Sequence, residues 1–530
     1  MLEVSCTFGY NAVVPLLDKQ YEKDEKTMSS SIEKKERKQA AQAEQQKKSK
    51  RFKRRATISV IVIVIVLALS IFVDSTYLYT KTTAVQIGDT GYSAAEFDYF
   101  YRTAYASFYR QYQSYISYFI DSSKSLTKQK CSFSSDENAT WADYFTESAI
   151  SDMQRITALC DQAAAEGFEL TDDGKTEIES SISDIEASAA SSGYKNPDKY
   201  LGMTIGKGMT LDLYRELVTK FYTARDYAQH QIDSYSYTDE ELKTYYAENK
   251  DAFDIITYNA YLVGTSLDRY SDFGDEAKVT AAHNDAETIA SATTQEEFAD
   301  KVLSMLDDSA KEGYTGVDYT LNTYSGDYLA KYVSSYSEWL LNDDRVEGDT
   351  TIIDTDNGSY AVMFISRDDN NYATKNTRHI LINAEADENG EFTDEALQAA
   401  KDKAEEILAE WKADPTEDHF AELANEYSED SGSNTDGGLY VNVSKNQFVT
   451  EYNDFLYNED HKPGDTAIVY GTNGSYAGYH IVYFVGNGVN YAEYLADNGK
   501  RTDDYNQFES DLIASYPAST KFCFKFAELD

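Results

Sequence analysis

Hydrophobic residues follow three different patterns along the chain, and the first is an unbroken apolar run. Residues 56–73, ATISVIVIVIVLALSIFV, are eighteen consecutive residues without a charge. As an α-helix with ~1.5 Å of rise per residue this run spans ~27 Å, which is about the thickness of a hydrocarbon core. The pattern predicts a single transmembrane helix at residues 56–73.

The flanks of this run predict its orientation. The basic segment KKSKRFKRR occupies residues 47–55, so the positive-inside rule places residues 1–55 in the cytoplasm, where we expect them to be disordered. Everything after Asp74 is then expected to be extracytoplasmic. The triplet Ala68-Leu69-Ser70 fits a cleavage site, but it lies inside the run, so an uncleaved signal anchor is favoured and cleavage stays open. Met28 is a second candidate start, which stays open too.

The second pattern is helical and covers residues 82–253. After a short β-like run at residues 83–88, Ser93 and Glu96 form a capping box before a tract whose aromatic residues recur at steps of three and four. This predicts one long amphipathic helix through residues 95–120, with further helices at residues 141–165 and 211–231. Thr238 with Glu241 predicts another helix start.

The third pattern alternates short β runs with helices, and it occurs twice. The segment EWLLNDDRVEGDTTIIDTDNGSYA at residues 338–361 matches DFLYNEDHKPGDTAIVYGTNGSYA at residues 454–477 with an offset of 116. Two copies of one domain are expected, at residues 254–370 and 375–486. Residues 487–530 form a C-terminal tail with a helix, and the sequence leaves open whether this tail packs on the second copy or on the helical region.

Charge separates the two sides of the apolar run. The net charge is −44, but residues 1–55 hold 14 Lys and Arg against 8 Asp and Glu, a net of +6, and the remainder holds 34 against 84, a net of −50. An exterior this acidic repels phosphate backbones, which argues against nucleic acid as a partner. Hydrophobic residues make up 42 % of the chain, too many for a mainly disordered protein. A disulfide between Cys131 and Cys160 stays open.

Four separated segments of the second copy resemble a known family. RHILI, FAELANEYSEDSGSNTDGG, KPGD and GYHIVYF follow one another in the order and spacing of the parvulin-type (PpiC, rotamase) peptidyl-prolyl isomerases. The helical region is similar to the chaperone region of PrsA/SurA-like membrane-anchored foldases. The resemblance implies an α+β fold class: a transmembrane helix, a helical SurA N-like region, and two tandem parvulin-like α+β domains of which the first is degenerate.

The resemblance also implies a site. It places a pair of histidines at His379 and His480 and the family's acidic or thiol position at Asp430. The substrate pocket falls on Ser431, Tyr440, Phe448 and Tyr452, where the family commonly has Leu, Met and Phe at the last three positions. In the first copy we expect Asn259 in place of His379, Ala361 or Val362 near His480, and no counterpart of YSED between Phe298 and Gly316.

The implied activity is cis/trans isomerisation of X–Pro bonds in unfolded or partly folded secreted polypeptides, without a cofactor or metal. His379, Asp430 and His480 are the residue types of a two-His, one-carboxylate metal site, but they lack a local chelating pair, so metal binding is not favoured. A second hypothesis is a non-catalytic holdase chaperone that uses parvulin folds as a client-binding scaffold. A third is an envelope interaction protein with neither activity.

Overall fold

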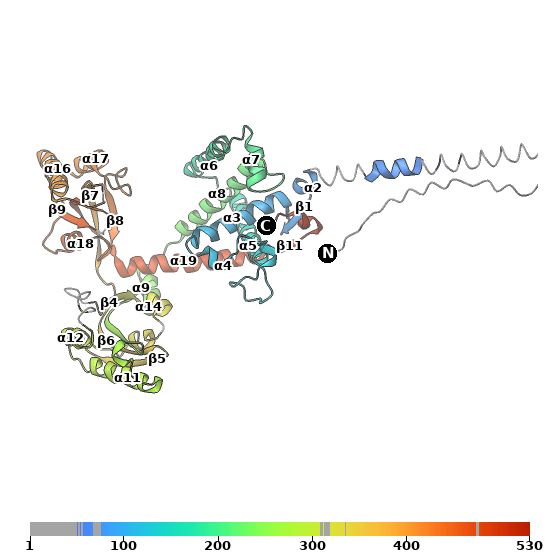
Figure 1. The fold of residues 1–530 in the computed structure, drawn as a ribbon. Helices are drawn as coiled ribbons and strands as arrows, with labels where there is room; N and C mark the ends of the chain where they lie inside the picture. Colours follow the sequence, from blue (N-terminus) through green and yellow to red (C-terminus); the bar gives the residue numbers. More distant parts are fainter. Residues whose placement is uncertain are drawn as a thin grey trace, which may run out of the picture. The chain divides into compact units, whose positions relative to one another are not determined.

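The computed structural model describes residues 50, 54, 57–66, 76–307, 311, 319–333, 335–388, 390–472 and 476–530. These fall into two compact units. Unit 1 comprises the described residues up to Gln154, Glu177–Thr219 and Pro517–Asp530, and unit 2 comprises Arg155–Thr176 and Lys220–Tyr516. Figure 1 shows the helices of the N-terminal region and two sheet-containing modules.

The structure describes only part of the predicted transmembrane segment. Residues 57–66 are helical and exposed, whereas residue 56 and residues 67–73 lie outside the described residues, as does the basic segment 1–55 apart from Lys50 and Arg54. Among the residues described, no helix combines the length and the apolar character needed to cross a bilayer.

The helical region follows the aromatic pattern with one correction. Helix α3 (Ala94–Gln111) begins with the predicted capping box of Ser93 and Glu96, but it ends at Gln111, so the prediction of one helix through residue 120 is wrong. The chain turns through Tyr112–Tyr115, and Phe119 after the turn packs back on Phe108 with 6.4 Å between ring centroids. The other helices of this region are α2 (Tyr77–Thr80), α4 (Ile116–Phe119), α5 (Trp141–Glu166), α6 (Asp172–Ser191), α7 (Pro197–Thr204) and α8 (Leu211–Ser234).

The C-terminal tail contributes to both units. In unit 2, helix α19 (Tyr491–Ala514) packs on α9 (Asp239–Glu248), and the Tyr245 hydroxyl donates to Asp503 at 2.6 Å. In unit 1, strand β11 (Ala518–Thr520) pairs with β1 (Thr83–Ile87), which pairs with β2 (Thr90–Ser93). The end of the tail therefore completes the small sheet of the helical region. The described cysteines, Cys131, Cys160 and Cys523, are free thiols.

The two modules have the same four-stranded antiparallel sheet. The order is β4-β3-β6-β5 in the first and β8-β7-β10-β9 in the second. The first module consists of β3 (Ile255–Gly264), α11 (Asp275–Ala290), α12 (Gln295–Met305), β4 (Leu321–Ser325), α14 (Gly326–Tyr332), α15 (Ser337–Leu340), β5 (Thr350–Thr355) and β6 (Gly358–Asp368). The second consists of β7 (Ala373–Asn383), α16 (Asp394–Ala413), α17 (Glu417–Tyr427), β8 (Leu439–Val443), α18 (Thr450–Leu456), β9 (Thr466–Thr472) and β10 (Ala477–Asn490). Helix α10 (Lys250–Phe253) precedes β3.

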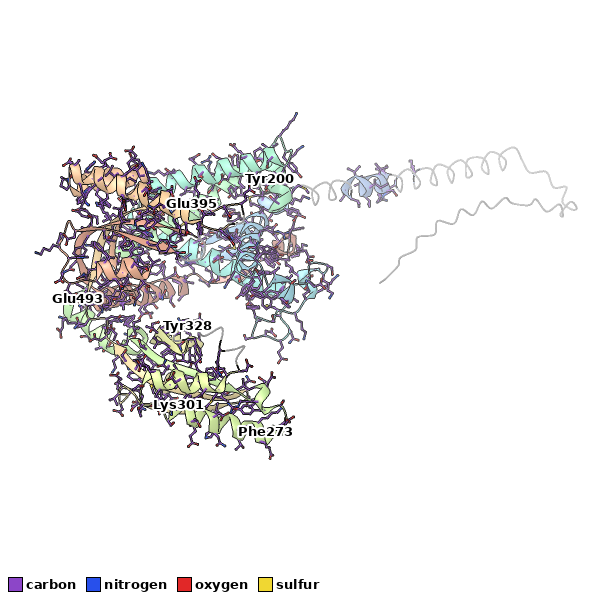
Figure 2. All side chains as sticks on the ribbon, turned by 60° about the vertical axis from the view of Figure 1, so that its left-hand side comes forward. Tyr200, Phe273, Lys301, Tyr328, Glu395 and Glu493 are labelled. Atoms are coloured by element: carbon purple, nitrogen blue, oxygen red, sulfur yellow. The ribbon has the colours of Figure 1, made fainter. Side chains whose placement is uncertain are left out.

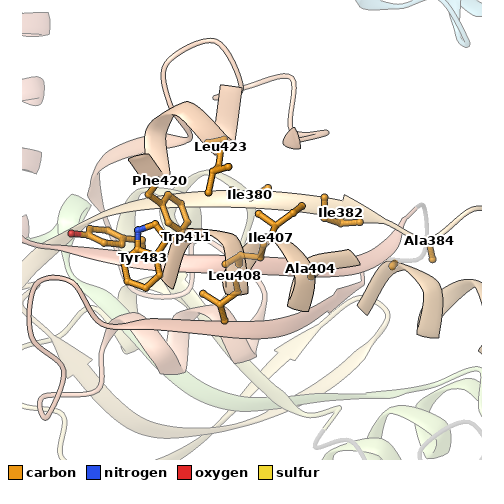
Figure 3. Packing of buried hydrophobic residues seen from close by; sticks show 13 residues of the cluster. Ile380, Ile382, Ala384, Ala404, Ile407, Leu408, Trp411, Phe420, Leu423 and Tyr483 are labelled. Carbon is orange, nitrogen blue, oxygen red and sulfur yellow. The ribbon is translucent and has the colours of Figure 1, made fainter. Parts of the chain in front are cut away.

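Each sheet is covered on both faces. In the second module, α16 and α17 pack on one face around Ile380, Trp411 and Phe420 (Figure 3), and α18 packs on the other face around Val482 and Phe484. The first module has α11 and α12 on one face and α14 and α15 on the other. Figure 2 shows Lys301 of α12 and Tyr328 of α14, one from each of these layers. The face under α18 carries the candidate site.

Hydrogen bonds align the two modules residue by residue. Phe364 in β6 and Phe484 in β10 each bond to the Gly-Asp pair that precedes the neighbouring strand. The backbone N–H of Ala260 donates to Thr320 O at 2.9 Å, and that of His379 donates to Gly438 O at 2.9 Å. Ala260 is therefore the counterpart of His379. The expectation of Asn259 there is wrong by one residue, and a one-residue shift turns a strand side chain to the opposite face of the sheet.

The counterpart of His480 is corrected in the same way. Tyr360 pairs with Leu262 as His480 pairs with Leu381, so neither Ala361 nor Val362 takes this position. The offset of 116 holds as far as Thr355 and Gly471. The second module then has four more residues before Gly478 than the first has before Gly358.

Candidate active site

The two predicted histidines lie side by side on neighbouring strands. His379 is in β7 and His480 in β10, and their backbones pair with Val482 and Leu381. The rings are stacked, with centroids 5.3 Å apart and planes inclined by 11°, and the two Nδ1 atoms are 3.1 Å apart. Both side chains are buried at the centre of the sheet.

Asp430 joins this pair from the loop after α17. Its Oδ2 lies 2.9 Å from His379 Nε2 and accepts hydrogen bonds from the hydroxyls of Ser433 at 2.6 Å and Tyr440 at 2.9 Å. The loop approaches β7 closely at Gly438, which has φ +69°, and a Cβ there would lie 2.2 Å from His379 O. Only glycine fits this conformation and this contact, so Gly438 is what brings the acidic loop to the histidines.

The environment sets the charge states of Asp430 and His480. The hydrogen bond from His379, with those from Ser433 and Tyr440, holds the pKa of Asp430 well below its usual range despite partial burial. Burial lowers the pKa of His480 to about 4, and the neighbouring His379 acts in the same direction, whereas Asp430 opposes the shift. At neutral pH Asp430 is therefore a carboxylate and His480 is a neutral imidazole.

These charges imply a direction for the hydrogen bonds. A carboxylate can only accept, so His379 presents its Nε2–H to Asp430. The Nδ1···Nδ1 contact holds one proton between the two rings. The Tyr476 hydroxyl lies 3.2 Å from the other ring nitrogen of His480, Nε2. A continuous chain thus runs from Tyr476 through His480 and His379 to Asp430.

Three aromatic side chains form a wall beside the histidines. Tyr452 is fully buried, and its hydroxyl lies 3.1 Å from Thr377 Oγ1. Phe448 stacks on Tyr452 at 4.7 Å, and Tyr440 meets Phe448 edge-on at 5.2 Å. His379 lies within 6.3 Å of all three rings, between centroids. The wall offers an apolar surface next to a polar chain.

The structure brings together all of the predicted site residues except Ser431. Ser431 is exposed, and the serine that contacts Asp430 is Ser433, which is buried. Sequence reasoning missed Ser433, Tyr476 and Thr377. Ser433 follows Asp430 by three residues, a spacing at which side chains in turns commonly bond, so this contact could have been found. Tyr476 could not, because its position depends on the length of the β9–β10 loop.

The first module has a different arrangement at the same place. Ala260 and Tyr360 replace the histidines, and Tyr336 contacts Tyr258 at 5.7 Å and Tyr360 at 5.0 Å between ring centroids. Aromatic side chains therefore occupy the equivalent space. The caps Thr294 and Thr416 and the buried Phe298 and Phe420 correspond with an offset of 122, which puts Asp308 at the place of Asp430 by count, and Asp308 lies outside the described residues. The expectation that no YSED-like loop lies between Phe298 and Gly316 falls in part on residues outside the described ones and stays a prediction.

Comparison with known proteins agrees with the geometry. Residues 360–486 match the family model of the PPIC-type PPIase domain. The chain carries a PPIC-type peptidyl-prolyl isomerase domain. The match confirms the parvulin-type resemblance, and it begins in β6, fifteen residues before the predicted boundary at residue 375. The second module is thus the one that the family model recognises as an isomerase.

Solved structures of similar proteins add little to this assignment. A peptidyl-prolyl isomerase, PrsA, from Bacillus anthracis is 15 % identical, with 46 % of this chain and 95 % of that chain covered and a TM-score of 0.18. PrsA from Bacillus subtilis is 14 % identical, with 44 % and 76 % covered and a TM-score of 0.13. No curated protein matches the chain. At these TM-scores the likeness supports no argument about this chain.

Proposed function

We propose that the protein is a membrane-anchored extracytoplasmic foldase, and that its PPIC-type domain isomerises X–Pro bonds in unfolded secreted polypeptides at His379, Asp430 and His480. The observation that supports the site is the continuous chain of hydrogen bonds from Asp430 through His379 to His480, beside an aromatic wall. The apolar run at residues 56–73 and the charge step from +6 to −50 support the anchor and its orientation.

The chemistry requires an environment more than a reactive group. Rotation about an X–Pro amide has a barrier of ~18–20 kcal/mol, which falls when the amide twists and loses resonance. A site that favours the twisted amide over the planar one lowers the barrier. In the proposed mechanism the proline ring contacts Tyr440 and Phe448, and the neutral His480 adds no positive charge to the adjacent polar surface. No covalent intermediate is needed.

A proline-limited refolding assay tests the isomerase proposal. The full-length chain should accelerate refolding, and the double substitution His379→Ala/His480→Ala should lower kcat/KM by roughly tenfold or more, since preorganised polar groups contribute at least that much. Tyr360→Phe, at the equivalent place in the first module, is the matched control and should leave the rate unchanged. Equal rates for the double variant and the wild type would refute the site.

A second experiment tests the alternative of a non-catalytic holdase. The Tyr-rich helical region motivates it, because tyrosine combines apolar area with a polar tip. If the double variant suppresses client aggregation as well as the wild type but no longer accelerates refolding, the two functions reside in different regions. If the wild type suppresses aggregation and shows no isomerase activity, the holdase replaces the isomerase.

Labelling with a membrane-impermeant maleimide tests the topology. In intact cells Cys523 should react and Cys6 should not, in a background where Cys131 and Cys160 are replaced by serine. Labelling of Cys6 before cell disruption would overturn the proposed orientation.

A further inference from the structure

A recess with cationic side chains lies in the second module, at the N-terminal end of β7. Its cavity volume is about 700 Å³, and it is formed by the start of β7, the loops on either side of α18 and the end of β10. We call it the Lys375 pocket. The side chains that matter here are those of Lys375, Lys445, His461, Tyr372, Tyr457 and Phe484.

Lys375 is the central cation of this pocket and has no carboxylate partner. Its Nζ donates to Asn487 Oδ1 at 2.7 Å and lies 5.4 Å from the ring centroid of Tyr457 and 5.7 Å from that of Phe484. No carboxylate of the described residues comes within 4.0 Å of it. Burial lowers the pKa of Lys375, whereas the described lysines with a raised pKa owe it to a neighbouring Asp, as Lys124, Lys175 and Lys331 do. An ammonium in this position would gain from an anion.

Other polar groups converge on the same recess. Lys445 Nζ lies 4.1 Å from the centroid of Tyr372 and 4.0 Å from the carboxylate of Asp368, a long ion pair. His461 keeps its Nδ1 on Phe455 O at 2.9 Å, which leaves Nε2 for another partner. Glu459 is the one acidic side chain in the lining, and it faces Lys375. The lining thus holds two lysines against one glutamate, in a chain of net charge −44.

We propose that the Lys375 pocket binds a carboxylate carried by a polypeptide, with the flanking apolar part of that segment against the rings of Tyr372 and Tyr457. A carboxylate matches two ammonium groups, and aromatic walls suit a peptide side chain better than a hydrated free ion. A chain this acidic repels anions elsewhere on its surface, so a recess of opposite sign is selective for them. The polypeptide as the source of the carboxylate rests on the proposed foldase function.

The position of the pocket suits a role beside the isomerase site. Lys375 precedes His379 by four residues, which corresponds to about 13 Å along a strand. Tyr452 of α18 contacts His379, and Tyr457 just after α18 contacts Lys375. The first module has Ile256 in place of Lys375, fully buried under α14 and α15. The described part of the first module therefore lacks the central cation of this pocket, and the pocket would favour client segments that carry an acidic residue near the X–Pro bond.

Direct binding of two proline-free peptides tests the proposal without catalysis. Fluorescein-labelled Ala-Tyr-Glu-Ala and Ala-Tyr-Gln-Ala amides are titrated with the full-length chain at constant ionic strength, and anisotropy is recorded. The Glu peptide should bind about tenfold more tightly than the Gln peptide, the effect of one partly buried charge-assisted contact. Lys375→Met should abolish this difference and Lys375→Arg should retain it. Met fills the space of the Lys stem, so thermal unfolding of Lys375→Met should match the wild type.

Lys403→Met is the matched control, because Lys403 is an exposed lysine of α16 in the same module and its loss changes the net charge equally. Its Glu/Gln ratio should equal that of the wild type. The proposal would be overturned if the wild type bound the two peptides equally. It would also be overturned if Lys403→Met lost the preference for the Glu peptide as Lys375→Met does. Glutarate that competes with an affinity equal to that of the Glu peptide would assign the pocket to small free anions and overturn the polypeptide. Because these results do not depend on isomerase activity, they are distinguishable from a failure of the proposed function.

Discussion

The two modules share one architecture and differ in what fills the same place. Both have the same strand order, both have a bulge where their two longest strands meet, and both have helices on each face of the sheet. In the second module buried histidines and a carboxylate occupy the face under α18, and in the first Ala260 and three tyrosines occupy it. Buried polar groups cost free energy unless they are paired, whereas a tyrosine cluster is held mainly by burial of apolar area. The fold thus accommodates either the polar site or the tyrosine cluster. The polar site costs free energy that the rest of the second module must offset.

The largest expected difference between the modules is in their response to acid. In the second module burial lowers the pKa of His480 from 6.5 to about 4. Below pH 6.5 the unfolded chain takes up a proton that the folded module does not, so stability is lost as the pH falls from 6.5 towards 4. The loss approaches about 3 kcal/mol of unfolding free energy. The first module has Tyr360 at this position and should lack this contribution.

Tryptophan fluorescence can separate the two responses. Trp339 lies in the first module and Trp411 in the second, so variants of the full-length chain with a single tryptophan report on each. In denaturant unfolding between pH 4 and pH 7.5, Trp411 should report the loss of unfolding free energy at low pH, and His480→Gln should remove that loss. The same dependence of unfolding free energy on pH at both tryptophans would mean that His480 is not its source.

The next effect concerns Gly471, where the second module needs a residue without a side chain because His480 lies against it. A Cβ on Gly471 in β9 would lie 2.7 Å from His480 Nε2 and 3.0 Å from the Tyr476 hydroxyl. The first module has Thr355 at the equivalent position. Gly471→Ala should push His480 out of the chain and lower kcat/KM roughly tenfold, because misplacement of about 1 Å in an active site has effects of this size or more. Gly202→Ala, where a Cβ meets nothing within 4 Å, is the control and should leave kcat/KM unchanged. Full activity of Gly471→Ala would show that the position of His480 does not matter.

A smaller effect is expected from the hydroxyl of Tyr440. Tyr440→Phe keeps the ring against Phe448 and removes one of three side-chain donors to Asp430. The loss of one hydrogen bond to a charged group suggests that kcat falls about three- to tenfold, with KM little changed since the apolar wall remains. A rise of KM at constant kcat would contradict this and would make Tyr440 a residue that only binds. Tyr427→Phe, which alters a tyrosine on the opposite face under α16, should have no effect.

How much of this comparison the sequence could predict depended on the kind of signal. The histidine pair and Asp430 were predictable, because four flanking segments match a family pattern and antiparallel neighbours bring His379 and His480 together. The end of α3 at Gln111 was not, since the aromatic spacing continues through the turn. The register of β6 was also beyond reach, because the second module has four extra residues between Gly471 and Gly478, and these break the constant offset. The choice of Ser433 over Ser431 depends on the path of a loop, which periodicity does not report.

The smallest expected effect is also the sharpest test of what the first module lacks. In the His379→Ala/His480→Ala background, the substitutions Ala260→His and Tyr360→His place two histidines at the equivalent positions of β3 and β6. We expect no measurable isomerase activity, because Tyr258 stands where the second module has Thr377, and its ring packs against Tyr336 in the space beside the histidines. A further change of Tyr258→Thr should open that space. Suppose that activity appears only when Tyr258→Thr is added to Ala260→His and Tyr360→His. The tyrosine cluster, and not the absence of histidines alone, would then explain why the first module is inactive. Activity with Ala260→His and Tyr360→His alone would contradict the steric argument.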